Sequence, residues 1–281
     1  MHAALRALYD QTLTIYRDDE RILGAWEFGS LGKGTGDEFS DVDPVFVVRD
    51  EDFVRVDAEL RPLFERLGAR VALWWPEGFN SDDIKNYAIL FEVGSELLQY
   101  DMTIAKVCSV RGGFGRRLLT QAGGVEVLFD KAGVIAETLA ANPTPRYEPT
   151  SLRWDIDHYW VYVYIHVKYA RRGDVWRLRY TVQTLFQIHM TVLHALYPGA
   201  YWGWWPWSVK HVLSPEERAG LEVYFEGGDA PALVDAIGRA SQVFARDARR
   251  AAAACGVEYP ADLEAAVWAY GARHAAGGGQ A

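Results

Sequence analysis

The spacing of apolar residues changes partway along the chain and divides it into two halves. In the first half, short apolar runs predict strands over residues 22–28, 42–48, 70–75, 87–93 and 97–104. Residues 125–129 fit a further strand or part of a helix. Apolar spacings of three and four predict helices over residues 5–16 and 52–67. The alternation of strands and helices favours an α/β domain.

Residues 142–149 mark the change between the halves. Their sequence, Asn-Pro-Thr-Pro-Arg-Tyr-Glu-Pro, is rich in proline and turn formers and predicts an interdomain linker. Long helical patterns follow it, over residues 152–172, 176–197, 230–254 and 259–274. We therefore expect a first domain over residues 1–145, with flanking helices around its sheet, and a second over residues 150–276 that is an α-helical bundle.

Two carboxylates stand at the start of the second predicted strand. Gly29-Ser30 is followed after ten residues by Asp41-Val42-Asp43. Because side chains alternate along a strand, Asp41 and Asp43 are predicted to share one face. Two adjacent carboxylates repel each other unless a cation lies between them. Mg²⁺, which prefers oxygen ligands and takes further oxygens from substrate phosphates, is the expected occupant.

A third carboxylate, Asp101, lies inside the apolar strand predicted over residues 97–104. If that strand neighbours residues 42–48, the three acids converge on one or two metal ions. Such a site suits phosphoryl or nucleotidyl transfer, in which metals stabilise charge on the equatorial oxygens. Gly29 would let the loop backbone approach a triphosphate, and the Ser30 hydroxyl would donate to its oxygens.

These segments resemble a known group of enzymes. Gly29-Ser30, Asp41-Val42-Asp43 and Asp101 look like the nucleotidyltransferase superfamily related to DNA polymerase β. The chain is more closely similar to the bacterial aminoglycoside 6-adenylyltransferases (streptomycin adenylyltransferases). The similar segments are residues 19–22, 27–30, 37–43 and 101–104, with weaker similarity at Asp155, His158, Trp160 and Lys210.

The resemblance implies an α/β (α+β) fold, with a nucleotidyltransferase-type mixed β-sheet and flanking helices followed by a helical substrate-binding domain. It implies transfer of AMP from ATP to a hydroxyl of an aminoglycoside such as streptomycin, with release of pyrophosphate and antibiotic resistance as the outcome. Asp41 and Asp43 would bind two Mg²⁺ ions, and Asp101 would be a third ligand or the general base. Gly29, Ser30 and Lys210, the last near the start of a short helix, would bind the nucleotide.

One position departs from the family pattern. Pro44 follows Asp43 where the family usually has an aliphatic residue. Proline removes a donor from the strand ladder, so we expect an edge, an irregularity or a free N–H at this position.

Weaker candidates have structural explanations that compete with functional ones. Asp155 and Asp157 are predicted in the first turn of a helix, where the helix dipole stabilises acids; they could instead bind substrate ammonium groups. Glu92 is a similar candidate. The aromatic stretch over residues 201–207 could be a stacking platform for a nucleobase or sugar, or it could pack helices together.

Composition narrows the partners. The 281-residue chain has a formal net charge of −9, which argues against nucleic-acid binding and suits a cationic acceptor, although it could serve solubility alone. Two distant cysteines and the lack of a long apolar run predict a cytoplasmic protein with no membrane span.

The sequence leaves alternative functions open. A lincosamide, another metabolite or a protein side chain remain alternative acceptors, and a non-catalytic nucleotide-binding module is an alternative of another class. Monomer and homodimer both remain open.

Overall fold

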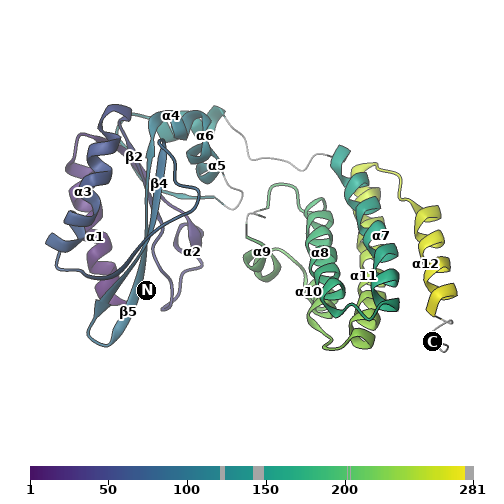
Figure 1. The fold of residues 1–281 in the computed structure, drawn as a ribbon. Helices are drawn as coiled ribbons and strands as arrows, with labels where there is room; N and C mark the ends of the chain where they lie inside the picture. Colours follow the sequence, from purple (N-terminus) through teal and green to yellow (C-terminus); the bar gives the residue numbers. More distant parts are fainter. Residues whose placement is uncertain (121–123, 142–148, 201, 203, 276–281) are drawn as a thin grey trace. The chain divides into compact units, whose positions relative to one another are not determined.

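The computed structural model describes residues 1–120, 124–141, 149–200, 202 and 204–275. The chain divides into two compact units, Met1–Pro145 and Arg146–Ala281 (Figure 1). No helix in the described ranges is long and apolar enough to cross a membrane.

A six-stranded mixed sheet forms the middle of the first unit. Its strands are β1 (Ile22–Glu27), β2 (Pro44–Val48), β3 (Arg70–Pro76), β4 (Ile84–Val93), β5 (Glu96–Lys106) and β6 (Glu126–Asp130). They lie in the order β3-β4-β5-β2-β1-β6. β2 and β5 pair in parallel, while the other neighbours pair antiparallel. The predicted mixed sheet is confirmed, and residues 126–130 form a strand rather than part of a helix.

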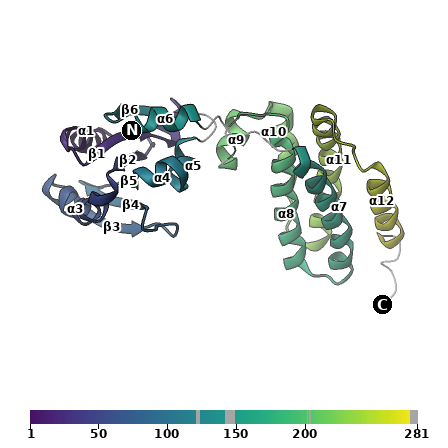
Figure 2. The same cartoon turned by 90° about the horizontal axis from the view of Figure 1, so that it is seen from above.

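The sheet is covered on both faces because its central strands are apolar on both. All five residues of β2 are buried. Phe46 and Val48 pack under α1 (Ala3–Asp18) and α3 (Phe53–Arg66). Val45 and Val47 face the opposite core, which contains residues of α4 (Val107–Gly112), α5 (Phe114–Leu119) and α6 (Val134–Ala141) (Figure 2). The two faces of the sheet are therefore distinct, and the parity of a residue decides which face it reaches.

Short elements near the site differ from the sequence prediction. α2 (Gly29–Gly32), α4, α5 and α6 have four to eight residues each, too few for a helical period to stand out. β2 begins at Pro44 instead of residue 42, and it is a central strand, not an edge. Proline is tolerated there because the first residue of a strand can do without its ladder donor.

The second unit is an α-helical bundle, as predicted. Its helices are α7 (Pro149–Arg171), α8 (Val175–His194), α9 (Trp205–His211), α10 (Pro215–Glu222), α11 (Ala230–Cys255) and α12 (Ala261–Ala275). α7 packs against α8, α11 and α12 around one apolar core. α7 begins three residues before the predicted start because Pro149 suits a first helical turn.

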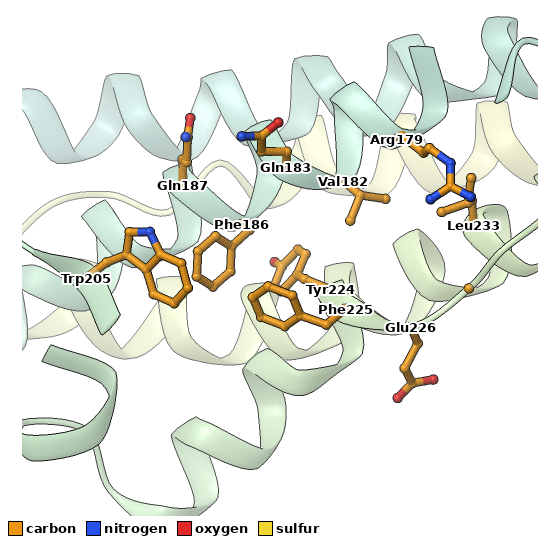
Figure 3. A pocket seen from close by; sticks show the side chains of 11 residues that line it. Arg179, Val182, Gln183, Phe186, Gln187, Trp205, Tyr224, Phe225, Glu226 and Leu233 are labelled. Carbon is orange, nitrogen blue, oxygen red and sulfur yellow. The ribbon is translucent and has the colours of Figure 1, made fainter. Parts of the chain in front are cut away.

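A buried polar network crosses this core. The imidazole of His189, 0% exposed, lies 3.2 Å from an Asp247 oxygen and 2.9 Å from the Tyr224 hydroxyl. The Tyr224 hydroxyl also lies 2.8 Å from that of Tyr159. Burial lowers the pKa of His189. The network fixes the short 3₁₀ helix η2 (Val223–Phe225), which carries Tyr224 and Phe225 to a surface hollow (Figure 3).

Candidate active site

Three aspartates from two segments, residues 41–43 and β5, meet beside the start of β2. Val42 forms an isolated parallel bridge with Tyr100, and the Asp101 N–H donates to the Val42 carbonyl at 2.9 Å. Val42 and Tyr100 pack into the core under α1 and α3. Their neighbours in sequence, Asp41, Asp43 and Asp101, therefore point to the other face.

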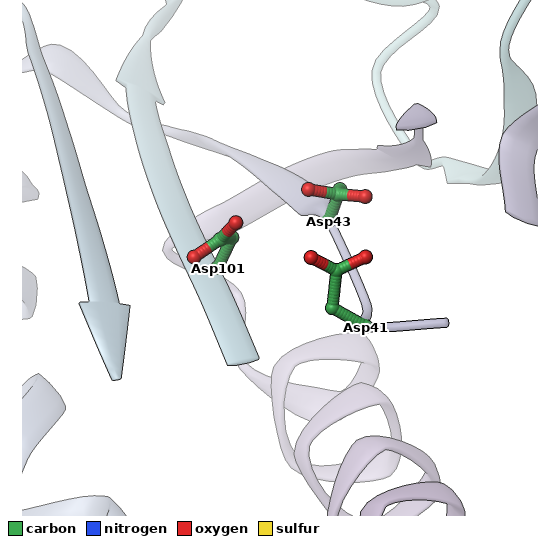
Figure 4. A group of neighbouring side chains, drawn as sticks. All are labelled: Asp41, Asp43 and Asp101. Atoms are coloured by element: carbon green, nitrogen blue, oxygen red, sulfur yellow. The ribbon is translucent and has the colours of Figure 1, made fainter. Parts of the chain in front are cut away.

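The carboxylates of Asp41, Asp43 and Asp101 are close enough to share a ligand. One oxygen of each lies within 4.8 Å of the others (Figure 4). Burial raises the pKa of Asp43 well above its usual range, and the charges of Asp41, Glu27 and Asp101 raise it further. Burial also raises the pKa of Asp101 to about 6, against a 2.9 Å hydrogen bond from Gln99 that lowers it. The site concentrates negative charge that the protein itself neutralises incompletely.

The donor set fits a divalent metal ion. Oδ1 of Asp101 is buried and accepts no hydrogen bond from any residue that the structure describes. An orphaned buried acceptor is costly, and a bound cation would satisfy it. The three groups are all carboxylates, with no histidine or cysteine, and oxygen ligands of this kind suit Mg²⁺.

The Gly29 loop lies directly against these acids. Gly29 has φ +67°, and a Cβ at this position would stand 1.9 Å from Oδ2 of Asp43. Phe28 N–H donates to the Asp43 carbonyl at 3.3 Å. The Ser30 hydroxyl, in α2, donates to Ser40 Oγ at 3.1 Å, so α2 is linked to the loop that leads to Asp41. Only glycine combines this backbone conformation with so close an approach.

Glu27, which the sequence analysis did not select, holds the backbone of Asp43 in place through a hydrogen bond. It is 1% exposed at the end of β1. One of its oxygens accepts the Asp43 N–H at 2.5 Å, and the other accepts the Tyr9 hydroxyl at 2.8 Å. Burial raises the pKa of Glu27 to about 7. The signal was available, because Glu27 is a charged residue in an apolar strand just as Asp101 is.

Lys33 is the second residue that the sequence analysis passed over. It is partly buried in the glycine-rich loop, and its Nζ lies 3.4 Å from the Gly29 carbonyl. Burial lowers its pKa, while the charge of Asp43 raises it. The ammonium group of Lys33 therefore places a positive charge near the aspartates. The glycine-rich sequence around Lys33 did not indicate this position.

Glu92 does not join the three aspartates. It lies on β4, four residues along the strand from Ala88, which pairs with Asp101. It forms an ion pair with Arg70 at 3.1 Å. A structural explanation therefore accounts for this side chain.

The remaining candidates belong to the second unit. Lys210 is exposed in the last turn of α9, so its predicted place near the start of a helix is wrong. Asp155 is buried in α7, and Asp157 pairs with Arg153 at 2.9 Å. Neither acid lies in the first turn, contrary to the prediction, because α7 begins at Pro149. In the aromatic stretch, residues 201 and 203 lie outside the described residues.

Replacing Gly29 by alanine tests the close approach of the loop, and Gly34 is a matched control. Both residues have positive φ, 67° and 68°, but a Cβ on Gly34 meets nothing within 4 Å. Gly34→Ala is expected to lower the free energy of unfolding by about 1–2 kcal/mol from backbone strain alone. Gly29→Ala should cost about 1–3 kcal/mol more through overpacking and should weaken Mg²⁺ binding. Urea unfolding and calorimetric Mg²⁺ titration measure both, and equal effects would contradict the geometry.

Substitutions of Glu27 test its support of Asp43. Glu27→Leu removes both acceptors and leaves two buried donors, the Asp43 N–H and the Tyr9 hydroxyl, without a partner. We therefore expect the free energy of unfolding to fall by about 2–4 kcal/mol. Glu27→Gln keeps an acceptor for the Asp43 N–H and should lose less. Tyr9→Phe, which removes one donor only, is the control. If the leucine and glutamine variants unfold at the same urea concentration, these hydrogen bonds do not support the site.

The raised carboxyl pKa values predict how pH and metal act together. An acid whose pKa is higher in the folded than in the unfolded state binds more protons when folded. Without metal, the free energy of unfolding should therefore fall as pH rises from about 4 through the folded pKa of Asp101, about 6. Mg²⁺ should offset this loss, so it should raise the melting temperature by several degrees at pH 7.5 and less at pH 5. Thermal shift with and without Mg²⁺ measures this, and an equal effect at both pH values would contradict it.

Comparisons with known proteins identify a family for this chain. A family model described as streptomycin adenylyltransferase matches residues 4–274. A solved structure of an aminoglycoside 6-adenyltransferase from Bacillus subtilis is similar at 16% identity, covering 95% of this chain and 97% of that one, with a TM-score of 0.44. A nucleotidyltransferase-like protein from Exiguobacterium sibiricum is 11% identical over 90% of this chain and 76% of that one, with a TM-score of 0.34. A search of curated proteins gave no match. Because the family model covers nearly the whole sequence, the chain belongs to the streptomycin adenylyltransferase family.

Proposed function

We propose that this protein transfers AMP from ATP to a hydroxyl group of an aminoglycoside such as streptomycin and releases pyrophosphate. Membership of the family makes it a nucleotidyltransferase of the adenylyltransferase type. The observation that carries the proposal is the convergence of Asp41, Asp43 and Asp101 within 4.8 Å. Residues 1–145 would act as the nucleotidyltransferase domain and residues 150–276 as the acceptor-binding domain.

Asp41, Asp43 and Asp101 would hold Mg²⁺, as two ions if the site is fully occupied. Bound magnesium stabilises the negative charge of the phosphates and keeps the reacting oxygens in line. Gly29 leaves its backbone open to the triphosphate, and the Ser30 hydroxyl donates to a phosphate oxygen. Lys33 adds a positive charge beside them, and Lys210 is proposed as a second phosphate contact.

The acceptor hydroxyl must lose a proton as its oxygen bonds to the α-phosphorus. The bond from that phosphorus to the bridging oxygen breaks, and pyrophosphate leaves. Asp101, with a pKa of about 6, is mostly ionised near pH 7 and is basic enough to take the proton. It would serve as the general base or as the third metal ligand. Both roles need the ionised carboxylate, and only the base takes up the proton during the reaction.

Other acceptors keep the same chemistry. A lincosamide, another small metabolite or a protein side chain could present the hydroxyl. A module that binds nucleotide without turnover is the candidate from another class, and the three intact aspartates argue against it, because a protein that only binds nucleotide does not need them all.

The direct test is incubation with ATP, Mg²⁺ and a panel of aminoglycosides, lincosamides and sugars. We expect an acceptor heavier by one AMP by mass spectrometry, with one pyrophosphate per product. Asp43→Asn should lower turnover by about a hundredfold or more, since each ~1.4 kcal/mol lost from transition-state stabilisation is tenfold. Expression in a sensitive bacterium should raise tolerance to the modified drug.

Asp10→Asn is the matched control, because it makes the same change at an exposed acid that pairs only with Arg6 among the described contacts. It should leave turnover within about twofold of the wild type. Tight ATP binding without pyrophosphate release for every acceptor would favour the binding module. Full turnover by Asp43→Asn would remove the catalytic proposal.

A further inference from the structure

A hollow in the helical unit has the size and lining of a ligand site. Its volume is about 390 Å³, within the range of small-molecule pockets, about 300–1,000 Å³. α8 forms one wall, and α9, η2 and the start of α11 form the rest. Arg179, Gln183 and Gln187 stand on the α8 wall at spacings of four residues, so they share one face of that helix (Figure 3).

Aromatic rings form an exposed surface on the opposite wall. Phe225 is 66% exposed and Trp205 is 42% exposed. Their ring centroids lie 6.2 Å apart with planes at 27°, and both rings contact Phe186, at 5.2 and 4.8 Å. Rings this close touch each other, so a planar group cannot insert between them. A ligand would instead lie over them, as on a platform.

The polar wall offers neutral hydrogen-bonding groups. Gln183 and Gln187 line the hollow, and their side-chain amides make no hydrogen bond with residues that the structure describes, so their donors and acceptors are available. The carboxylate of Glu226 is held by Arg239 at 2.6 Å. Arg179 donates to the Gly228 carbonyl at 2.7 Å. The hollow therefore lacks a spare carboxylate to receive an ammonium group.

We propose that this hollow binds an uncharged, polyhydroxylated ring of the acceptor, such as a sugar. The apolar face of such a ring covers Phe225 and Trp205, and its hydroxyls pair with the amides of Gln183 and Gln187. The cationic groups of the acceptor bind elsewhere. This inference rests on the proposed function in that it assigns the ring to the acceptor of that reaction.

Calorimetric titration of the full chain without nucleotide tests the inference. The probes are streptomycin, other aminoglycosides and neutral glycosides. Phe225→Ala should weaken binding of the best probe about tenfold, through loss of stacking and covered area. Gln183→Ala should weaken it severalfold. Trp176→Ala is the matched control, because Trp176 is an 82% exposed aromatic at the start of α8 outside the hollow, and it should bind as the wild type does.

The outcomes separate this inference from the proposed function. If the wild type adenylylates an acceptor while Phe225→Ala and Gln183→Ala bind it with unchanged affinity, the hollow is not the acceptor site. The proposed function is then still supported. Binding that depends on Phe225 without any adenylylated product supports the hollow and removes the function. Failure of every probe to bind overturns the inference. A separate titration with ATP completes the test: weakened ATP binding in Phe225→Ala with unchanged acceptor affinity would show that the hollow takes a nucleobase, which also overturns the inference.

Discussion

Mutual repulsion among three neighbouring carboxylates, one buried and two half-buried, is the constraint around which the first unit is organised. Asp41, Asp43 and Asp101 lie within 4.8 Å, and Asp43 is only 8% exposed. Left to themselves, such groups would move apart or take up protons. The parallel β2–β5 pairing and the bridge between Val42 and Tyr100 hold them in place. The apolar packing of the sheet therefore stabilises an arrangement that electrostatic repulsion opposes. Active sites commonly lower the stability of a protein in this way.

The three aspartates of this site could be selected from the sequence with two simple rules. Alternation along a strand placed Asp41 and Asp43 on one face, and a charge inside an apolar strand singled out Asp101. The pairing of their strands was an assumption that the sequence could not supply, because register between distant segments depends on tertiary packing. Glu27 shows the same limit, since its partners Tyr9 and Asp43 come from different elements.

Errors in the prediction arose where a local feature overrode the apolar pattern. Pro149 starts α7 early and takes Asp155 and Asp157 out of the first turn. Pro44 delays β2 until after the aspartates. Lys210 fell at the opposite end of a seven-residue helix, α9, whose direction and limits the aromatic pattern could not show. The aromatic stretch proved partly structural, since Trp205 packs edge-on to Phe186, and partly exposed.

Charge balance gives the three aspartates a further consequence. When ionised they carry three negative charges, with Lys33 as the nearby cation that acts on Asp43. One divalent ion would offset two of those charges, and a second would exceed them unless an anion arrived with it. A triphosphate is such an anion, and it also supplies oxygen ligands to the metal. Full metal occupancy is therefore expected to depend on nucleotide. The carboxylates continue to repel one another until both the metal ions and the triphosphate are bound.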